Sequence, residues 1–562
     1  MPDELHHIKF SDATWSHDDQ GIFYQTFPKP EAKSTLGSET DPNKEAKLFY
    51  HKIGTEQSQD RLICGVDPSL PTGMWGTEVS NDGRFLLLTN SQNTDPRSRT
   101  YVASLNVDGS VPSTLRWIAF ADKFEYQLSY LASDGNVFYF MTNKDAQRYR
   151  IIKVTFDLAE AKATQEPWTL SVGSSVKVEE VVPEDKGDAV LNSATVIDND
   201  KLLLVYSRNV IDELWLHDLK TGKQITRLLP NLVGSIVQIS GKREDQSAFI
   251  SSSSFVSPGT ITRLQWTGGK AEEVPEVKTH RTTKVKGINP EDYISEQKWF
   301  ESTDGTRVPM FITYHKDTKL DGTAPAWLYA YGGFQIPLSP AFSPSMMTWV
   351  TMYGGVLVWV NVRGGGEFGE QWHESGRRFN KHHTFEDVLS AAKFVHENKI
   401  AAKGRIILNG GSNGGMTVMS SLNMAKDEHG VGAGVAEVGV LDALRFNLFT
   451  IGSAWVADYG NPQDPEDFDN IRTFSPLHNV QDRAYPTTIF LTGDHDDRVS
   501  PLHTFKMTAE LQYRLKDNPN PILCRIDLNS GHGAGKSLQK RIDEICDKYS
   551  AVARALKLEL RK

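Results

Sequence analysis

The sequence predicts two unlike domains: an all-β half, then a half built on a doubly wound, mostly parallel α/β sheet. Three observations support this. The chain has 562 residues, more than a single domain usually holds. The first half consists of short strand-like runs opened by turn residues, and the second alternates longer strands with helical stretches. We place the domains at residues 1–285 and 286–562, with a linker-like segment at 284–292.

One pattern repeats in the first half, where a turn rich in Asp, Asn or Gly precedes an apolar strand. It recurs about every 45–65 residues, close to the roughly 40–50 residues of a propeller blade. The apolar runs are 22–24, 85–88, 137–140, 202–205 and 248–250. A plain β-sandwich would not need such long periods, so we predict a β-propeller domain with about five blades.

Helical periodicity marks the second half. Residues 384–398 carry apolar residues at helical spacing, and residues 501–516 have a similar pattern. Strand-like runs lie between these stretches. Such alternation predicts parallel strands covered by helices on both faces.

The segment Gly410-Gly411-Ser412-Asn413-Gly414-Gly415 is the most informative part of this half. It follows a strand-like run at 405–409 and precedes a helix-like run at 416–425. Strand, Gly-x-Ser-x-Gly and helix together are typical of the nucleophile elbow of α/β-hydrolases. The glycines are needed because side chains there would collide with the crossing strand and helix. The pattern therefore predicts Ser412 as a nucleophile at the carboxyl edge of the sheet.

A serine nucleophile needs a base, and the base needs an orienting acid. Two strand-like runs downstream, 487–492 and 522–526, open into loops that contain these residue types. The second loop supplies His532 as the base. The first offers Asp494, Asp496 and Asp497, and spacing alone does not choose among them. His495 precedes the acid, which breaks the Ser, Asp, His order of α/β-hydrolases, so we interpret it as a structural residue.

Six motifs resemble segments of the prolyl oligopeptidase (prolyl endopeptidase) family. They are YGGF (331–334), RGGGE (363–367), NGGSNGG (409–415), WVADYG (455–460), DHDDRV (494–499) and GHGAGK (531–536). The resemblance runs from near residue 8 to the C-terminus. It implies an α/β-hydrolase catalytic domain joined to a propeller.

The resemblance also implies roles for individual residues. Ser412 would be the nucleophile, His532 the base and Asp496 the orienting acid. The Tyr331 hydroxyl and the Asn413 backbone N–H would form the oxyanion hole, which holds the negatively charged oxygen of the intermediate.

A pocket for the substrate proline is implied in the same way. Trp455 would stack on the pyrrolidine ring, and Arg498 would donate to a substrate carbonyl. The other walls would be Phe334, Val440, Tyr459 and Val499. A flat aromatic face suits a ring that has no N–H to satisfy. Relatives that cut after Arg or Lys place acids in this pocket. Asp458 and Glu437 are candidates for such acids only if the motifs are aligned differently.

The implied activity is a serine endopeptidase that hydrolyses short peptides after proline through an acyl-enzyme, without a cofactor. A first alternative is a macrocyclising transpeptidase, in which the peptide's own amine captures the acyl group. A second is a catalytically inactive interaction protein. An esterase or lipase fits less well, because the motifs of Tyr331 and Trp455 do not belong to that class.

The chain also departs from the family pattern. Members normally begin with a segment that belongs to the hydrolase domain, and seven blades follow. Here we count about five, so we expect that segment and the first blades to be missing. Missing blades would expose two sheet edges and an apolar face.

Composition narrows the possible partners. The net charge of −10 disfavours nucleic acid. No signal peptide is visible, and the longest apolar runs, such as 356–360, are too short to cross a membrane. Three cysteines suit a reducing compartment, and no clustered Cys/His pattern predicts a metal. We therefore expect a cytoplasmic monomer whose partners are short proline-containing peptides.

Overall fold

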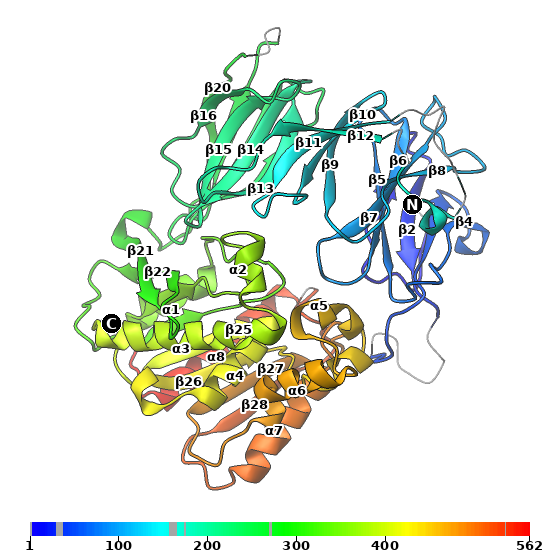
Figure 1. Ribbon diagram of the computed structural model, residues 1–562. Helices are drawn as coiled ribbons and strands as arrows, with labels where there is room; N and C mark the ends of the chain where they lie inside the picture. Colours follow the sequence, from blue (N-terminus) through cyan, green and yellow to red (C-terminus); the bar gives the residue numbers. More distant parts are fainter. Residues whose placement is uncertain are drawn as a thin grey trace.

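The computed structural model describes residues 3–29, 38–156, 164, 166–173, 176–268, 272–533 and 535–561. Figure 1 shows an N-terminal part made of small sheets above a C-terminal part with one large sheet and most of the helices. None of the helices in the described residues combines the length and apolar character needed to cross a bilayer.

The N-terminal part consists of five four-stranded antiparallel sheets, each made of consecutive strands. The first two sheets are β1 (Thr14–Trp15), β2 (Gly21–Thr26), β3 (Lys47–Lys52), β4 (Arg61–Cys64) and β5 (Met74–Val79), β6 (Phe85–Ser91), β7 (Ser98–Ser104), β8 (Trp117–Ala121). The third is β9 (Leu128–Asp134), β10 (Val137–Thr142), β11 (Arg150–Phe156), β12 (Val176–Val182). The last two are β13 (Val190–Ile197), β14 (Lys201–Arg208), β15 (Ile211–Asp218), β16 (Gln224–Leu228) and β17 (Ser235–Ser240), β18 (Ser247–Ser253), β19 (Thr260–Gln265), β20 (Glu276–Thr282).

The repeated turn-and-strand pattern marks the same place in every sheet. Its apolar runs fall on β2, β6, β10, β14 and β18, the second strand of each. The turn is the hairpin that leads into that strand. At β6, Gly83 has φ +70°, and the Ser80 N–H donates to the Phe85 carbonyl across the turn. The prediction of about five propeller blades is confirmed.

Each pair of neighbouring sheets shares its own hydrophobic core. On β14, Leu202 and Leu204 pack toward the third sheet, whereas Leu203 and Val205 pack toward the fifth. Successive side chains point to opposite faces of a strand, so a middle sheet is buried on both sides. Within the described residues no core cluster joins the fifth sheet to the first, and every residue of β20 is exposed. The five sheets thus form an arc (Figure 1).

The C-terminal part is built on an eight-stranded sheet in the order β21-β22-β24-β23-β25-β26-β27-β28. β21 and β22 are antiparallel to their neighbours, and the pairs from β24 to β28 are parallel. The strands are β21 (Tyr293–Glu301), β22 (Arg307–His315), β23 (Ala326–Tyr329), β24 (Val356–Val360), β25 (Ile406–Gly411), β26 (Val431–Glu437), β27 (Thr487–Gly493) and β28 (Ile522–Asp527). This is the predicted α/β-hydrolase fold.

The α-helices of this part are α1 (Pro344–Tyr353), α2 (Glu370–Glu374), α3 (His382–Glu397), α4 (Asn413–Met424), α5 (Val456–Tyr459), α6 (Pro465–Phe474), α7 (Leu502–Arg514) and α8 (Leu538–Ala555). The longer ones cover both faces of the sheet. Val388 of α3, Leu422 of α4 and Leu511 of α7 pack in one core, and Trp349 of α1 and Val552 of α8 pack in the other.

The two parts are in direct contact. The backbone N–H groups of Asn43 and Thr94 donate to the carbonyls of Thr450 and Ala454, at 2.8 and 3.0 Å. Elsewhere on the interface, Phe255 packs into the core of the α/β part. The loops around Thr450 and Ala454 are therefore held by the propeller.

Candidate active site

Ser412 lies at the sharp turn between β25 and α4, with φ +59° and ψ −118°. Its N–H donates to the Glu437 carbonyl on β26 at 2.8 Å. The turn needs glycine because the backbone is crowded. A Cβ on Gly410 would lie 2.6 Å from the Ala330 carbonyl oxygen. A serine in this strained conformation projects from the carboxyl edge of the sheet.

His532 and Asp496 meet at the same edge. The Nδ1 of His532 lies 2.7 Å from Oδ2 of Asp496, whose side chain is fully buried. The other carboxylate oxygen accepts the N–H groups of Arg498 and Val499 at 3.1 and 2.9 Å. Asp496 is thus held rigidly and can fix the tautomer and orientation of the His532 ring.

The rival acids have other partners. Oδ1 of Asp494 lies 2.7 Å from Nδ1 of His495, and it also accepts the Ser530 N–H. Asp497 is 41% exposed and lies 3.7 Å from the Lys9 ammonium. The geometry favours Asp496 as the partner of His532, and His495 is occupied by Asp494.

The Ser412 and His532 side chains are not joined by a hydrogen bond among the described contacts. The Tyr331 phenol lies near Ser412. Burial, with the nearby charge of Asp458, raises the pKa of Tyr331, so its hydroxyl stays protonated and can donate. Catalytic hydrogen bonds are often long without substrate and tighten when it binds.

Asn413 has a second role that the sequence did not reveal. Its backbone N–H, at the start of α4, has no acceptor within the helix. Its side chain donates to the Tyr331 carbonyl at 2.6 Å and accepts from the Tyr459 hydroxyl at 3.0 Å. The Asn413 amide therefore ties the turn after β23 to a wall of the neighbouring apolar pocket.

The expected apolar pocket residues lie in one cluster. Its members include Phe334, Val440, Trp455, Tyr459 and Val499. Phe446, which the sequence gave no reason to choose, lies among them: its ring stacks on Trp455 at 6.1 Å and meets the edge of Tyr459 at 5.2 Å. The cluster forms an aromatic wall beside Ser412.

The propeller contributes side chains to this region. Met74, at the start of β5, packs against the cluster. The Arg498 guanidinium lies over the Phe10 ring at 5.7 Å, and the Arg498 carbonyl accepts the Thr450 hydroxyl. No local sequence signal marks Met74 or Phe10, because they reach the site only when the two domains dock.

Asp458 and Glu437 are already paired. One Asp458 oxygen accepts the Phe334 N–H at 2.8 Å and lies 3.0 Å from Nε2 of His373. Glu437 accepts from Lys548 at 2.9 Å. Both acids are therefore used to hold the structure.

Lys381 supports the turn after Tyr331. It is fully buried, and its ammonium donates to the Gly332 carbonyl at 2.6 Å. Burial lowers the pKa of Lys381 to about 8. This lysine positions the backbone beside the Tyr331 hydroxyl, and the sequence motifs did not include it.

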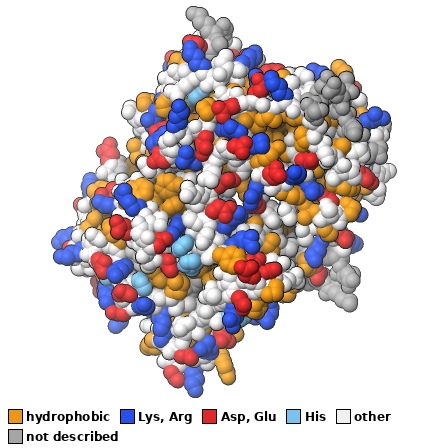
Figure 2. All heavy atoms as spheres, viewed as in Figure 1, with side chains coloured by type: hydrophobic (Ala, Val, Ile, Leu, Met, Phe, Trp, Pro, Cys, Tyr) orange, Lys and Arg blue, Asp and Glu red, His pale blue; other side chains and the backbone are white. Residues whose placement is uncertain are grey.

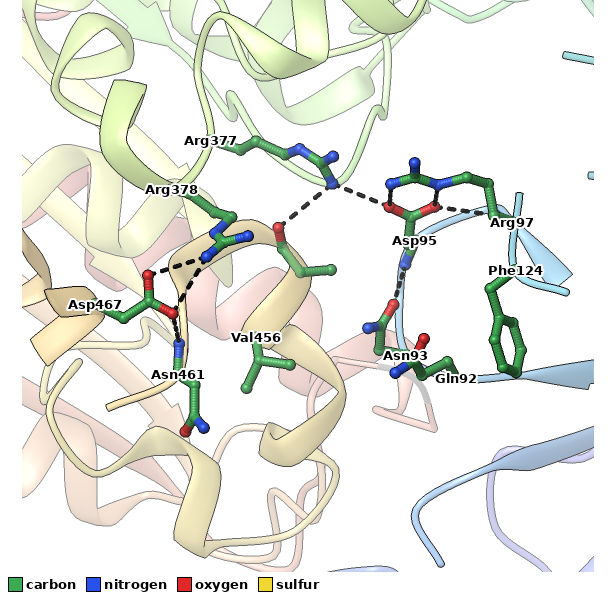
Figure 3. A pocket seen from close by; sticks show the side chains of 11 residues that line it. Gln92, Asn93, Asp95, Arg97, Phe124, Arg377, Arg378, Val456, Asn461 and Asp467 are labelled. Carbon is green, nitrogen blue, oxygen red and sulfur yellow. Dashed lines mark hydrogen bonds and ion pairs between the residues drawn. The ribbon is translucent and has the colours of Figure 1, made fainter. Parts of the chain in front are cut away.

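A cavity of about 410 Å³ lies between the two domains, and Val456 and Ala457 are among the residues that line it. Figure 3 shows Arg377 of the hydrolase domain reaching Asp95 in the β6–β7 loop of the propeller. The Arg377 guanidinium lies 3.2 Å from Asp95 and 3.4 Å from the Ala457 carbonyl, and Arg97 also donates to Asp95. Burial opposes ionisation of Asp95, but hydrogen bonds from Arg97 lower its pKa to about 2.

Two family models match the chain. Residues 1–276 match the N-terminal β-propeller domain of prolyl oligopeptidase, and residues 340–559 match the prolyl oligopeptidase family. Prolyl oligopeptidase A of Amanita bisporigera is 40% identical over 560 residues, which cover 99% of this chain and 70% of the relative. The prolyl endopeptidase of Elizabethkingia meningoseptica is 34% identical over 552 residues, covering 98% and 72%.

A second fungal relative, the dual function macrocyclase-peptidase POPB of Galerina marginata, is 40% identical over 563 residues, covering 100% of this chain and 73% of the relative. Among solved structures, prolyl oligopeptidase B from Galerina marginata bound to a 35mer hydrolysis and macrocyclization substrate matches with a TM-score of 0.90 at 38% identity, covering 100% and 74% of the two chains. Its apo form matches with a TM-score of 0.67 at 37% identity, covering 99% and 73%. With both halves matched, the chain belongs to the prolyl oligopeptidase family of serine peptidases.

Proposed function

We propose that this protein hydrolyses peptide bonds on the carboxyl side of proline in short peptides, with Ser412 as nucleophile, His532 as base and Asp496 as orienting acid. One observation carries the proposal. The His532–Asp496 pair, with 2.7 Å between its atoms and a buried carboxylate, lies at the same sheet edge as the strained turn of Ser412 and beside the aromatic cluster of Trp455.

The reaction follows from these positions. His532 accepts the Ser412 hydroxyl proton as the serine oxygen attacks the carbonyl carbon of the substrate proline. The Tyr331 hydroxyl and the Asn413 N–H donate to the oxyanion. His532 then protonates the leaving amine, which leaves an ester between Ser412 and the peptide. Water, deprotonated by His532, hydrolyses this ester and releases the serine.

Specificity for proline follows from the apolar wall. The Trp455 indole and its neighbours offer a flat apolar surface to a side chain that carries no charge and no backbone N–H. One oxygen of Asp458 is engaged with His373 and Glu437 is engaged with Lys548, whereas the other Asp458 oxygen is buried without a partner among the described residues. Because Asp458 is fully buried, it offers no exposed carboxylate to an Arg or Lys side chain. Arg498 would hydrogen-bond a substrate carbonyl.

A second candidate is macrocyclisation. It is favoured by the 40% identity to a relative named as a dual function macrocyclase-peptidase. The same acyl-enzyme would be captured by the peptide's own amine instead of water. Mass spectrometry of a long proline-containing peptide separates the two, because the cyclic product lacks the mass of the added water.

Cleavage of reporter peptides with Pro, Ala or Arg before the scissile bond tests the main proposal, with Ser412→Ala as the control. We expect cleavage after Pro only, abolished in Ser412→Ala. Equal cleavage after Ala or Arg would contradict the role of the aromatic pocket. A fluorophosphonate probe that fails to label folded wild-type protein would instead support an inactive interaction protein.

The proposal extends to the organisation of the chain. We divide it into a propeller at 1–285 and a peptidase domain at 286–562, acting as a cytoplasmic monomer on short proline-containing peptides. The three cysteines are free thiols, which suits a reducing compartment. Acidic and basic side chains are mixed over the face seen in Figure 2, a distribution that does not favour nucleic acid there.

A further inference from the structure

Three side chains that bind metals well gather on the first turns of α3. The ligand atoms of His382, His383 and Glu386 all lie within 4.8 Å of one another. Residues three and four apart share one face of a helix, which brings Glu386 beside both imidazoles. In the described residues this is the one group of three or more such side chains close enough to hold an ion.

Two of these side chains are held by a neighbour that leaves an electron pair available. Nδ1 of His383 lies 2.9 Å from the Ser375 carbonyl, to which it donates, so Nε2 carries the lone pair. The His382 ring is exposed and lies close to that of His383, with 4.2 Å between the ring centroids. The Thr303 hydroxyl donates to one Glu386 oxygen at 2.8 Å. Histidines that bind metals almost always donate their other ring N–H in this way, which orients the ligand atom.

The charges around the group favour a cation. Asp304 lies 3.9 Å from Nε2 of His383, and Asp387 lies on the same helix. Arg363 is paired with both acids, at 2.5 and 2.7 Å. Arg363 therefore partly neutralises these two acids, whereas Glu386 has no ion pair among the described residues. This carboxylate acts against the positive end of α3, which by itself would repel a cation.

The group lies outside the proposed chemistry. Neither histidine is part of the aromatic cluster, and neither hydrogen-bonds Ser412, Tyr331 or His532 among the described contacts. The proposed hydrolysis uses none of the three side chains, so their arrangement needs a separate explanation.

We propose that His382, His383 and Glu386 form a binding site for one divalent transition-metal ion, with Zn²⁺ as the reference ion and water completing its shell. Imidazole nitrogen and carboxylate oxygen are ligands that Zn²⁺ accepts, at about 2.0–2.2 Å. Ligand atoms around a tetrahedral ion are therefore about 3.4 Å apart. The observed ligand atoms, all within 4.8 Å of one another, would therefore approach by roughly an ångström to bind one ion.

The first test is Zn²⁺ titration of the metal-free full chain, followed by calorimetry and by competition with a chromophoric chelator. The variants are His382→Gln/His383→Gln and Glu386→Gln, which keeps an oxygen to accept from Thr303. The control is His6→Gln/His7→Gln, the other adjacent histidine pair, whose rings lie 6.4 Å apart. We expect the α3 double variant to lose one Zn²⁺ equivalent and Glu386→Gln to bind roughly 10–100-fold more weakly. The control should bind like wild type.

Thermal unfolding gives an independent readout, because an ion that binds only the native state stabilises it. Zn²⁺ should raise the Tm of wild type and of the His6/His7 control more than that of either α3 variant. Equal Zn²⁺ stoichiometry and equal Tm shifts in wild type and Glu386→Gln would overturn the proposal. If the double variant fails to fold, the Glu386→Gln comparison decides alone.

Discussion

Asp496 shows what a residue's surroundings add to its place in the sequence. The loop after β27 offers three aspartates, and spacing does not rank them. The structure separates them by contact: Asp496 is buried against His532, Asp494 holds His495, and Asp497 faces Lys9. A burial difference of this kind is set by the packing of the whole loop, so spacing could not predict it, and only the family motif at 494–499 pointed to Asp496.

Replacing this acid should reduce catalysis more than binding. In Asp496→Asn the amide no longer stabilises the imidazolium or the right tautomer of His532, and a loss of about 10⁴ in kcat is expected. Asp497→Asn is the matched control, since it removes a half-exposed carboxylate one residue away. Steady-state kinetics on a proline reporter measure both. Equal losses in the two variants would argue against Asp496 as the orienting acid.

Tyr331 should act on the transition state. Tyr331→Phe keeps the ring and removes the hydroxyl near Ser412. We expect kcat to fall by about 10²–10³ with little change in KM. Tyr459→Phe is the control, because its hydroxyl donates to the Asn413 side chain and not toward the serine. A Tyr331→Phe defect confined to KM would contradict an oxyanion role.

The buried carboxyl group of Glu367 should make the stability of the fold depend on pH. It is fully buried, and among the described residues its Oε2 has no partner. Burial raises the pKa of Glu367 to about 7 from its usual 4.5. The folded state thus binds a proton more tightly than the unfolded state. Protonation of Glu367 therefore stabilises the folded state fully below pH 4.5, and this stabilisation is lost as the pH rises through 7.

A neutral side chain of the same shape at position 367 should remove the loss of stability at high pH. Glu367→Gln is expected to be more stable than wild type at pH 8 by on the order of 1–3 kcal/mol, with a smaller difference at pH 5. Urea unfolding at both pH values measures it. Glu397→Gln, an exposed carboxylate on α3, should show no such change. A pH-independent difference for Glu367→Gln would rule out this carboxyl as the titrating group.

At the scale of elements, local patterns predicted most of what lies within one strand or helix. The expected helices at 384–398 and 501–516 correspond to α3 and α7, because apolar spacing within a helix is a local property. The sites of Met74 and Phe10 were not predictable, since they reach the pocket only when the two domains dock. Phe446 was not predictable because it meets Trp455 and Tyr459 only through the folding of loops within the peptidase domain. Lys381 was missed for a similar reason: its partner, Gly332, is on another loop.

The β6–β7 loop should act as a latch between the domains through Asp95. Asp95→Asn weakens the pairing with Arg377 across the interface. We expect a larger radius of gyration by small-angle scattering and faster proteolysis at the interface. High salt should narrow the difference from wild type, because screening weakens the same pair. Asp145→Asn, an exposed propeller acid, is the control. Unchanged scattering in Asp95→Asn at low salt would show that the latch is not needed.

At the scale of the whole molecule, Ser412 lies where two domains meet. Met74 and Phe10 of the propeller reach the pocket side, and Thr94 and Asn43 hold its loops. The sequence predicted the two folds separately, but it could not predict their relative placement. The TM-score is higher to the substrate-bound structure of prolyl oligopeptidase B (0.90) than to its apo form (0.67). A difference of this size concerns the arrangement of the whole molecule, which the sequence did not predict.

This placement predicts selection by substrate size. A short peptide with one proline should be cleaved, whereas the same segment within a stably folded domain should resist, because the domain cannot pass between propeller and peptidase. Mass spectrometry of both substrates measures the ratio. Unfolding mutations in the substrate domain serve as the control and should restore cleavage. Equal rates for the folded domain and the free peptide would contradict a site guarded by the propeller.

The separate cores between neighbouring sheets have a mechanical consequence. Within the propeller, the described core clusters join each blade only to the one before it and the one after it, while Phe255 also anchors the fifth sheet to the peptidase domain. The blades therefore form a linear array and not a closed ring. Fraying that begins at the exposed strand β20 need not spread to the second sheet. The second sheet, which presents Asp95 and Met74 to the peptidase domain, can stay ordered while β20 at the exposed edge of the fifth sheet frays.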